Sequence, residues 1–80
     1  MPKLKRLTAK EILTILTNFG FVVTSQKGSH TKLVRQIANE KQVLTIPNHS
    51  TLDTGTCRAI LRQASRYINP TDLSTYFYSE

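Results

Sequence analysis

The tripeptide Gly28-Ser29-His30 is the part of the sequence best suited to chemistry. The pKa of a free imidazole is about 6.5, so a histidine can accept or donate a proton near neutral pH. Beside a ribose, His30 could take the proton of the 2′-hydroxyl, whose oxygen would then attack the adjacent phosphate. These residue types indicate cleavage of an RNA phosphodiester without a metal ion as a candidate chemistry.

The residues around His30 are suited to holding a phosphate. Gly28 lets a phosphate approach the backbone, because no side chain stands in the way. The Ser29 hydroxyl and the backbone N–H groups of the turn can donate to phosphate oxygens. Lys27 and Lys32 flank the turn and can neutralise charge as it develops on the phosphate. Taken alone, however, such a tripeptide is more often a surface histidine after a Gly-Ser turn than a catalytic site.

Two further features each have two interpretations. His49 could supply a second proton transfer, to the leaving 5′-oxygen, or could simply begin a loop, and the sequence favours the loop. Arg58, Arg62 and Arg66 recur every four residues with no acidic residue between them. Like charges at that spacing on a helix repel, so the row is either a solvated helix face or a surface that contacts phosphates or a partner protein.

The charge of the chain favours a polyanionic partner. Eleven Lys and Arg residues stand against five Asp and Glu, which gives a net charge of +6 and a pI near 9.9. A charge this one-sided on a small protein favours nucleic acid, or an acidic protein that occupies the same surface. Eighty residues are enough for one domain, and we expect it to span residues 1–80.

Cysteine and histidine usage favours a protein without a bound metal. Cys57 is the only cysteine, so an internal disulfide is excluded, and its place on an apolar helix face predicts a core residue. Two histidines and one cysteine far apart in sequence make a poor metal site, and we expect no metal and no cofactor. Residues 1–6 are basic but lack the apolar stretch of a signal peptide, and no run reaches the roughly 20 apolar residues of a membrane span. We therefore expect a cytoplasmic protein with no membrane contact.

The first predicted element is a helix over residues 8–19. Thr8 and Glu11 have the spacing of a capping box, and Gly20 stands where a left-handed C-terminal cap is expected. The apolar residues repeat at helical spacing and should form its buried face: Ala9, Ile12, Leu13 and Leu16.

Three strands are predicted next, over residues 21–26, 30–37 and 42–46. Lys27-Gly28-Ser29 supplies the first turn, residues 38–41 form the second loop, and Pro47 ends the third strand. Connections this short favour an antiparallel meander.

A second helix is predicted to begin at Asp53 or Thr54 and to run on smoothly to Arg66 and Tyr67. Asn69 and Pro70 then start a short third helix. The expected buried stripe of the second helix is Cys57, Ile60, Leu61, Ala64 and Ile68. The fold class is therefore α+β: an α-β-β-β-α chain with one three-stranded antiparallel sheet, both helices on one face and a short C-terminal helix, as in double-stranded-RNA-binding domains.

Three segments together resemble the HicA-type mRNA interferases, toxins of the HicAB toxin–antitoxin systems. They are Gly20-Phe21 with residues 26–30, then residues 46–49, then residues 55–64, and the resemblance covers roughly residues 7 to 78. The chain departs from the family at Thr31, where many relatives carry a second histidine, at Cys57, where an aliphatic residue is usual, and at Ser65, where glycine is frequent.

The resemblance implies a double-stranded-RNA-binding-like fold and ribonuclease activity on messenger RNA. It implies His30 as the catalytic residue and a HicB-type antitoxin that masks the active site. The turn residues, the two lysines, Arg58 and Arg62 are the candidate RNA contacts. We expect no DNA contact by the toxin alone. The alternatives are a non-catalytic double-stranded-RNA-binding module and a degenerate relative kept only as a protein partner.

Overall fold

Helix α1 (Ala9–Asn18) begins at the capping box that the sequence predicts. In the computed structural model, which describes residues 3–79, the Thr8 backbone N–H donates to the Glu11 carboxylate at 2.9 Å and the Glu11 N–H donates to the Thr8 hydroxyl at 3.1 Å. Hydrogen bonds to the ionised carboxylate from the Thr8 backbone N–H and then from the Thr8 hydroxyl lower the pKa of Glu11. The chain is thereby fixed at the point where it enters the helix.

The end of α1 is also as predicted. Gly20 follows the helix with a φ of +94°, a left-handed conformation that favours glycine. The Phe21 N–H donates to the Leu16 carbonyl at 3.1 Å and the Gly20 N–H to the Thr17 carbonyl at 3.0 Å, which is the bond pattern of a Schellman motif. The chain therefore leaves α1 in a fixed direction and enters the sheet.

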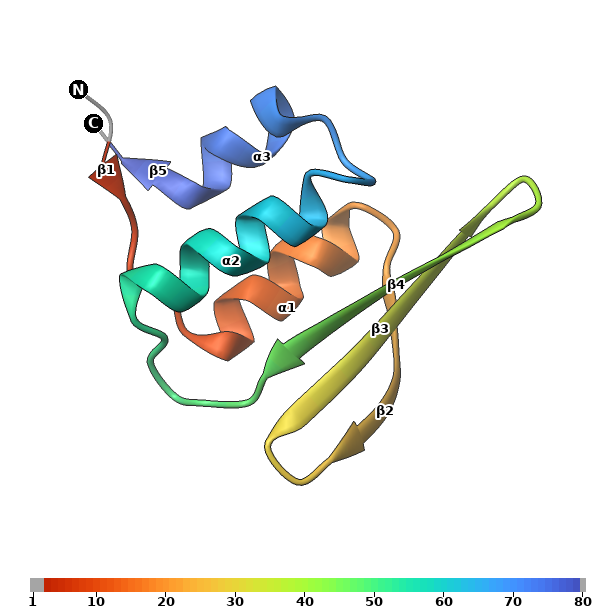
Figure 1. The fold of residues 1–80 in the computed structure, drawn as a ribbon, viewed down its shortest axis with the longest axis horizontal. Coiled ribbons are helices and arrows are strands. Elements are labelled where there is room, and N and C mark those ends of the chain that lie inside the picture. Colours follow the sequence, from red (N-terminus) through yellow and green to blue (C-terminus); the bar gives the residue numbers. More distant parts are fainter. Residues whose placement is uncertain (1–2, 80) are drawn as a thin grey trace.

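The sheet consists of β2 (Val22–Lys27), β3 (His30–Ile37) and β4 (Glu40–Pro47), in that spatial order and antiparallel (Figure 1). The first turn is shorter than predicted, since only Gly28 and Ser29 lie outside the strands.

The prediction that residues 38–41 form a loop, with the third strand starting at residue 42, was wrong. Ala38 and Asn39 alone make the turn, and Ile37 pairs with Glu40. Ala38 adopts a φ of +54°, which closes a two-residue hairpin turn of the kind that matches strand twist. A positive φ at alanine is uncommon, so the sequence did not indicate it.

Helix α2 (Thr54–Ala64) is capped by Asp53, whose carboxylate accepts from the Thr56 N–H at 2.7 Å. The same bond lowers the pKa of Asp53. The predicted continuation to Arg66 and Tyr67 was wrong, because α2 ends at Ala64 with Ser65 as its C-cap. The Ser65 hydroxyl donates to the Leu61 carbonyl at 2.7 Å, and the next N–H groups form tighter turns: Arg66 to Gln63 and Tyr67 to Ala64.

Helix α3 (Pro70–Phe77) starts as predicted, with Asn69 as its cap accepting from the Thr71 N–H at 2.9 Å. The sequence did not predict a two-stranded ribbon in which β1 (Lys3–Leu4) pairs with β5 (Tyr78–Ser79). It brings the two ends of the described chain together (Figure 1). The predicted α-β-β-β-α order with a short C-terminal helix is confirmed. None of the helices within residues 3–79 is long and apolar enough to cross a membrane.

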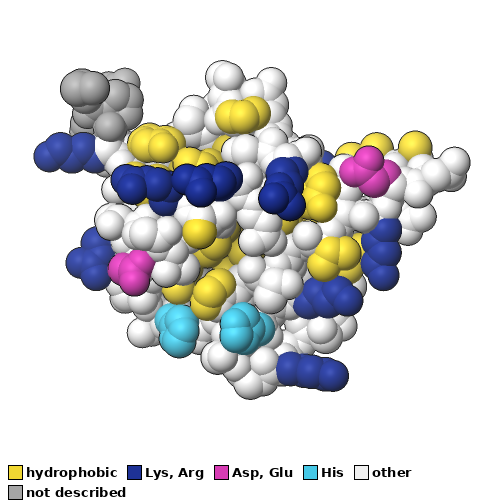
Figure 2. Space-filling model, in the orientation of Figure 1, with side chains coloured by type: hydrophobic (Ala, Val, Ile, Leu, Met, Phe, Trp, Pro, Cys, Tyr) yellow, Lys and Arg dark blue, Asp and Glu magenta, His cyan; other side chains and the backbone are white. Residues whose placement is uncertain are grey.

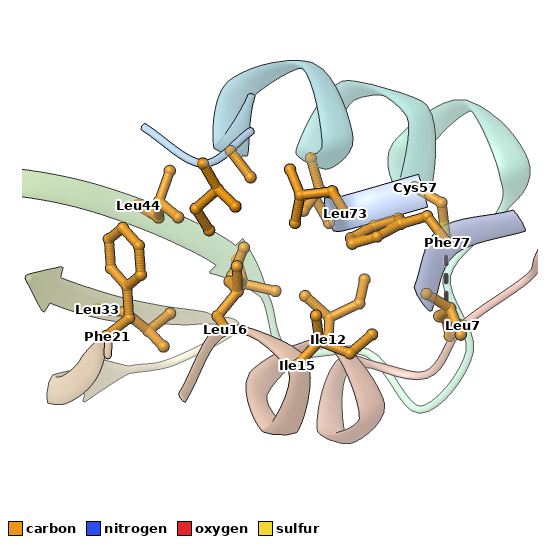
Figure 3. Packing of buried hydrophobic residues seen from close by; sticks show 14 of the residues in the cluster. Leu7, Ile12, Ile15, Leu16, Phe21, Leu33, Leu44, Cys57, Leu73 and Phe77 are labelled. Atoms are coloured by element: carbon orange, nitrogen blue, oxygen red, sulfur yellow. Dashed lines mark hydrogen bonds between the residues drawn. The ribbon is translucent and has the colours of Figure 1, made fainter. Parts of the chain in front are cut away.

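Both long helices bury their apolar stripes against one face of the sheet. Leu33 pairs with Leu44 and Thr31 with Ile46, so these four side chains share a face, and all are buried. Cys57 is fully buried as predicted, near the backbone of the segment before α1 (Figure 3). Three residues differ from the expected stripes: Ile15 is buried, whereas Leu13 and Leu61 are only partly buried. The fully enclosed aromatic and aliphatic core includes Ile12, Leu16, Phe21, Leu33, Leu44, Leu52, Leu73 and Phe77.

The Arg35 guanidinium joins the sheet to the ends of both long helices. It donates to the Phe19 carbonyl at the end of α1 (2.8 Å), to the Tyr67 carbonyl after α2 (2.7 Å) and to the Gln42 side chain on β4 (2.8 Å). It also lies over the Phe21 ring, 4.7 Å from the centroid, where a cation is attracted to the face of the ring. One side chain therefore fixes three elements relative to one another.

Arg35→Lys should destabilise the protein by about 2 kcal/mol, because hydrogen bonds from a charged donor contribute about 1.5–3 kcal/mol and one ammonium cannot reach all three acceptors. Urea unfolding measures the change, and Arg66→Lys, at an exposed position, is the control, expected within about 0.5 kcal/mol of wild type. Equal unfolding midpoints for the two variants would contradict the role of Arg35.

Candidate functional site

His30 is the first residue of β3, directly after the two-residue turn. Gly28 has a φ of +54°, and positive φ at the first turn position is typical of hairpin turns that place glycine there. His30 pairs with Lys27 on one side and with Pro47 on the other. An exposed imidazole is thus attached to a strand paired on both sides, rather than to a mobile loop.

Ser29 orients the His30 ring. Its Oγ lies 3.2 Å from His30 Nδ1, and its carbonyl accepts a hydrogen bond from the Asn48 N–H. When Nδ1 carries the ring proton and donates to Ser29 Oγ, Nε2 has a free lone pair and can accept a proton. In that tautomer the ring has one hydrogen-bonded nitrogen and one free nitrogen, as a general base requires.

The two predicted lysines lie on the same hairpin as His30. Lys27 is the cross-strand partner of His30, and Lys32 follows two residues later on β3, so all three side chains share the face opposite the helices. All three are exposed. Sequence neighbours on a tight hairpin are necessarily close in space, and the predicted group of Lys27, Gly28, Ser29, His30 and Lys32 does lie together.

The predicted arginines lie on another element. Arg58 and Arg62 are exposed on α2, and Arg66 is exposed just after it. Figure 2 shows Lys and Arg side chains in a row over the region of α2, on the same face of the molecule as both histidine side chains. The arginines are therefore not part of the hairpin group, but a long ligand on this face could contact both.

His49 lies in the loop between β4 and α2, in line with the sequence-based preference for a loop. The loop is held by main-chain bonds, since the Ala9 N–H donates to the His49 carbonyl at 3.2 Å and the Leu52 N–H to the Leu7 carbonyl at 3.1 Å. The imidazole itself is exposed. Its closeness to His30 could not be read from the sequence, because it depends on the pairing of β3 with β4.

Thr31 faces away from this group. Its side chain is only 2% exposed, and its Oγ1 is a buried polar atom with no hydrogen-bond partner among the described residues. The position at which the sequence departs from the expected family pattern therefore lies in the core. Within residues 3–79, no three His, Cys, Asp or Glu side chains are grouped as metal ligands would be.

A hollow of about 400 Å³ lies between α1, α3 and the segment before α1. It is lined by Lys5, Lys10 and Tyr76 among others, and by none of the predicted site residues. The histidine group is separate from this hollow and its side chains are exposed, which suits a polymer better than a small enclosed molecule.

The fold and the site define a small, basic α+β protein that presents a histidine on a hairpin beside a positively charged surface. The family model for the HicA toxin of bacterial toxin–antitoxin systems matches residues 9–65. The chain belongs to this family, which confirms the resemblance seen in the sequence. The match runs from the first residue of α1 to the C-cap of α2, so it includes the hairpin, the His49 loop and the arginines on α2. No curated protein and no solved structure matches the chain.

Gly28→Ala should destabilise the protein by about 1–2 kcal/mol, because a side chain in the left-handed region is strained even though a Cβ at Gly28 would meet no other atom. Gly55→Ala is the matched control: Gly55 lies in α2, and its Cβ would make only an ordinary contact, 3.5 Å from Asp53 Oδ1. That variant should gain about 0.4–1 kcal/mol. Thermal or urea unfolding of both proteins checks the opposite signs, and the same sign for both would contradict a strained turn at Gly28.

Proposed function

We propose that this HicA-family toxin is a metal-independent endoribonuclease that cleaves messenger RNA, with His30 as the catalytic residue. The observation that carries the proposal is the exposed His30 ring at the start of β3, oriented by Ser29 at 3.2 Å. His30 takes the proton of a ribose 2′-hydroxyl, and the resulting oxygen attacks the adjacent phosphorus. The bond to the 5′-oxygen breaks and a 2′,3′-cyclic phosphate is left.

The hairpin also provides the groups that hold the phosphate. Gly28 leaves open space above the turn, since no atom lies within 4 Å of the position of a Cβ. The Ser29 hydroxyl and the turn N–H groups donate to phosphate oxygens, while Lys27 and Lys32 offset the negative charge of the transition state. Arg58 and Arg62 contact phosphates of the same RNA further along the strand.

The second partner is an antitoxin, since the chain is the toxin of a toxin–antitoxin pair. We propose that the antitoxin is of the HicB type and masks His30. The site is exposed to solvent and lies on the same face as a row of Lys and Arg side chains (Figure 2), so a protein with acidic groups can cover it and exclude RNA from the same surface.

His30→Ala should abolish toxicity and slow RNA cleavage by at least about 100-fold, the lower end of what general acid–base catalysis contributes. The fold should be unaffected, within about 0.5 kcal/mol, because the side chain is exposed. Wild type and variant are each expressed without antitoxin, and growth is followed while total RNA is separated on a gel. Equal toxicity of the variant would exclude His30 as the catalytic residue.

Arg62→Ala should weaken RNA binding and reduce the slope of log affinity against log salt by about one, the loss of one phosphate contact. The measurement uses the His30→Ala background so that the RNA stays intact. Lys41→Ala is the control. It removes the same charge, but Lys41 lies next to the turn between β3 and β4, opposite Gln36, and its loss should leave the slope unchanged.

The same proteins separate cleavage from the alternative, a double-stranded-RNA-binding module without catalysis. The exposed arginines on α2 are the observation that favours that alternative. RNA that remains intact after long incubation with the wild type, together with binding lost in Arg62→Ala but kept in His30→Ala, would support the binding module.

A further inference from the structure

We propose that His49 is the second proton-transfer residue of the site and donates a proton to the leaving 5′-oxygen. This inference rests on the proposed function, because it concerns the same cleavage reaction. It is carried by a juxtaposition that the sequence does not show: the start of β3 and the end of β4 bring the only two histidines of the chain to one exposed face (Figure 2).

The pairing of β3 with β4 sets the distance between the two histidines. His30 is directly opposite Pro47, and directly opposed Cα atoms are about 4.5–5.5 Å apart. His49 follows two residues later, and two residues extend the chain by at most about 7 Å. The Asn48 N–H donates to the Ser29 carbonyl, so the two segments are still hydrogen-bonded to each other beyond the last paired residue. The Cα atoms of the two histidines are therefore at most about 13 Å apart.

Main-chain bonds hold His49 in place and leave its side chain free. Its carbonyl accepts from the Ala9 N–H at the first turn of α1, and Leu52 at the other end of the loop donates to Leu7. The Leu52 side chain is itself only 2% exposed. The imidazole is exposed and is not needed for any of these contacts. A loop fixed in this way positions the ring for chemistry, whereas a ring that stabilised the loop would be buried in it.

A second residue of this kind would accelerate the reaction. In an in-line attack the 2′-oxygen and the 5′-oxygen lie on opposite sides of the phosphorus, so the base beside one cannot easily reach the other. His30 Nε2 takes the 2′-proton, the bond between phosphorus and the 2′-oxygen forms, and the bond to the 5′-oxygen breaks. Protonated His49 gives its proton to that 5′-oxygen, so the products are a 2′,3′-cyclic phosphate and a 5′-hydroxyl. His30 takes up one proton and His49 releases one, so the protons of the step balance.

The test compares two substrates at the site that wild type cleaves. One is ordinary RNA, and in the other sulfur replaces the 5′-oxygen of the scissile bond. A thiol has a pKa of about 8.5, far below that of an alcohol, so a thiolate leaves without being protonated. His49→Gln should cleave ordinary RNA at least about 100-fold more slowly than wild type but cleave the sulfur substrate close to the wild-type rate. His30→Ala should be slow on both.

Two controls separate chemistry from folding. Ser50→Ala changes the neighbouring exposed side chain of the same loop and should match wild type on both substrates. His49→Gln keeps the carbonyl that binds Ala9, so its urea unfolding midpoint should equal that of wild type.

Two results would overturn the inference while the proposed function stands, provided that His30→Ala is inactive. In the first, His49→Gln cleaves ordinary RNA at the wild-type rate. In the second, His49→Gln loses the same fraction of the cleavage rate on both substrates. If wild type cleaves neither substrate, or His30→Ala cleaves as well as wild type, the proposed function fails and the role of His49 fails with it.

Discussion

The structure depends on one cation placed where three elements meet. The carbonyls that end α1 and follow α2 have no partner within their own helices, and partly buried carbonyls of this kind are costly unless they are satisfied. Arg35 satisfies both, and its positive charge lies where the helix dipoles are negative. Gly20 lies beside it, and a Cβ there would lie 3.4 Å from the Arg35 side chain, at the limit of ordinary van der Waals contact, so glycine is favoured there by its φ. Together with the apolar core, this contact holds the sheet, and so the hairpin, under the helices.

The features that the sequence predicted are those controlled by neighbouring residues. The capping box at Thr8, the cap at Asp53 and the Asn69-Pro70 start each involve bonds across two or three residues, and a local pattern is enough to specify them. The end of α2 involves Tyr67, whose carbonyl binds a residue 32 positions away, and no local pattern contains that partner. The β1–β5 ribbon was missed for the same reason, because it joins the two ends of the described chain. The likeness to double-stranded-RNA-binding domains stays a prediction, since no solved structure matches.

The candidate site likewise contains residues that the sequence could place and one that it could not. Gly28, Ser29 and His30 could be found as a group because a two-residue turn keeps sequence neighbours together. The sequence could not place His49 beside them, since a shift of one residue in the β3–β4 register would turn every side chain of the strand to the opposite face. The register is fixed by the buried pair Leu33 and Leu44. The core therefore determines the geometry of the exposed histidines, although neither of them takes part in it.

Because the site is built from exposed side chains on main-chain supports, stability and chemistry are carried by different atoms. Backbone carbonyls and N–H groups hold the turn and the His49 loop, while the imidazoles and the lysines extend into solvent. These exposed side chains suit a long polymer better than a small enclosed ligand. A chain with a net charge of +6 attracts acidic proteins and RNA to the same cations. If the antitoxin covers the same cations as the RNA, as proposed above, competition on one shared surface is sufficient for it to control the toxin.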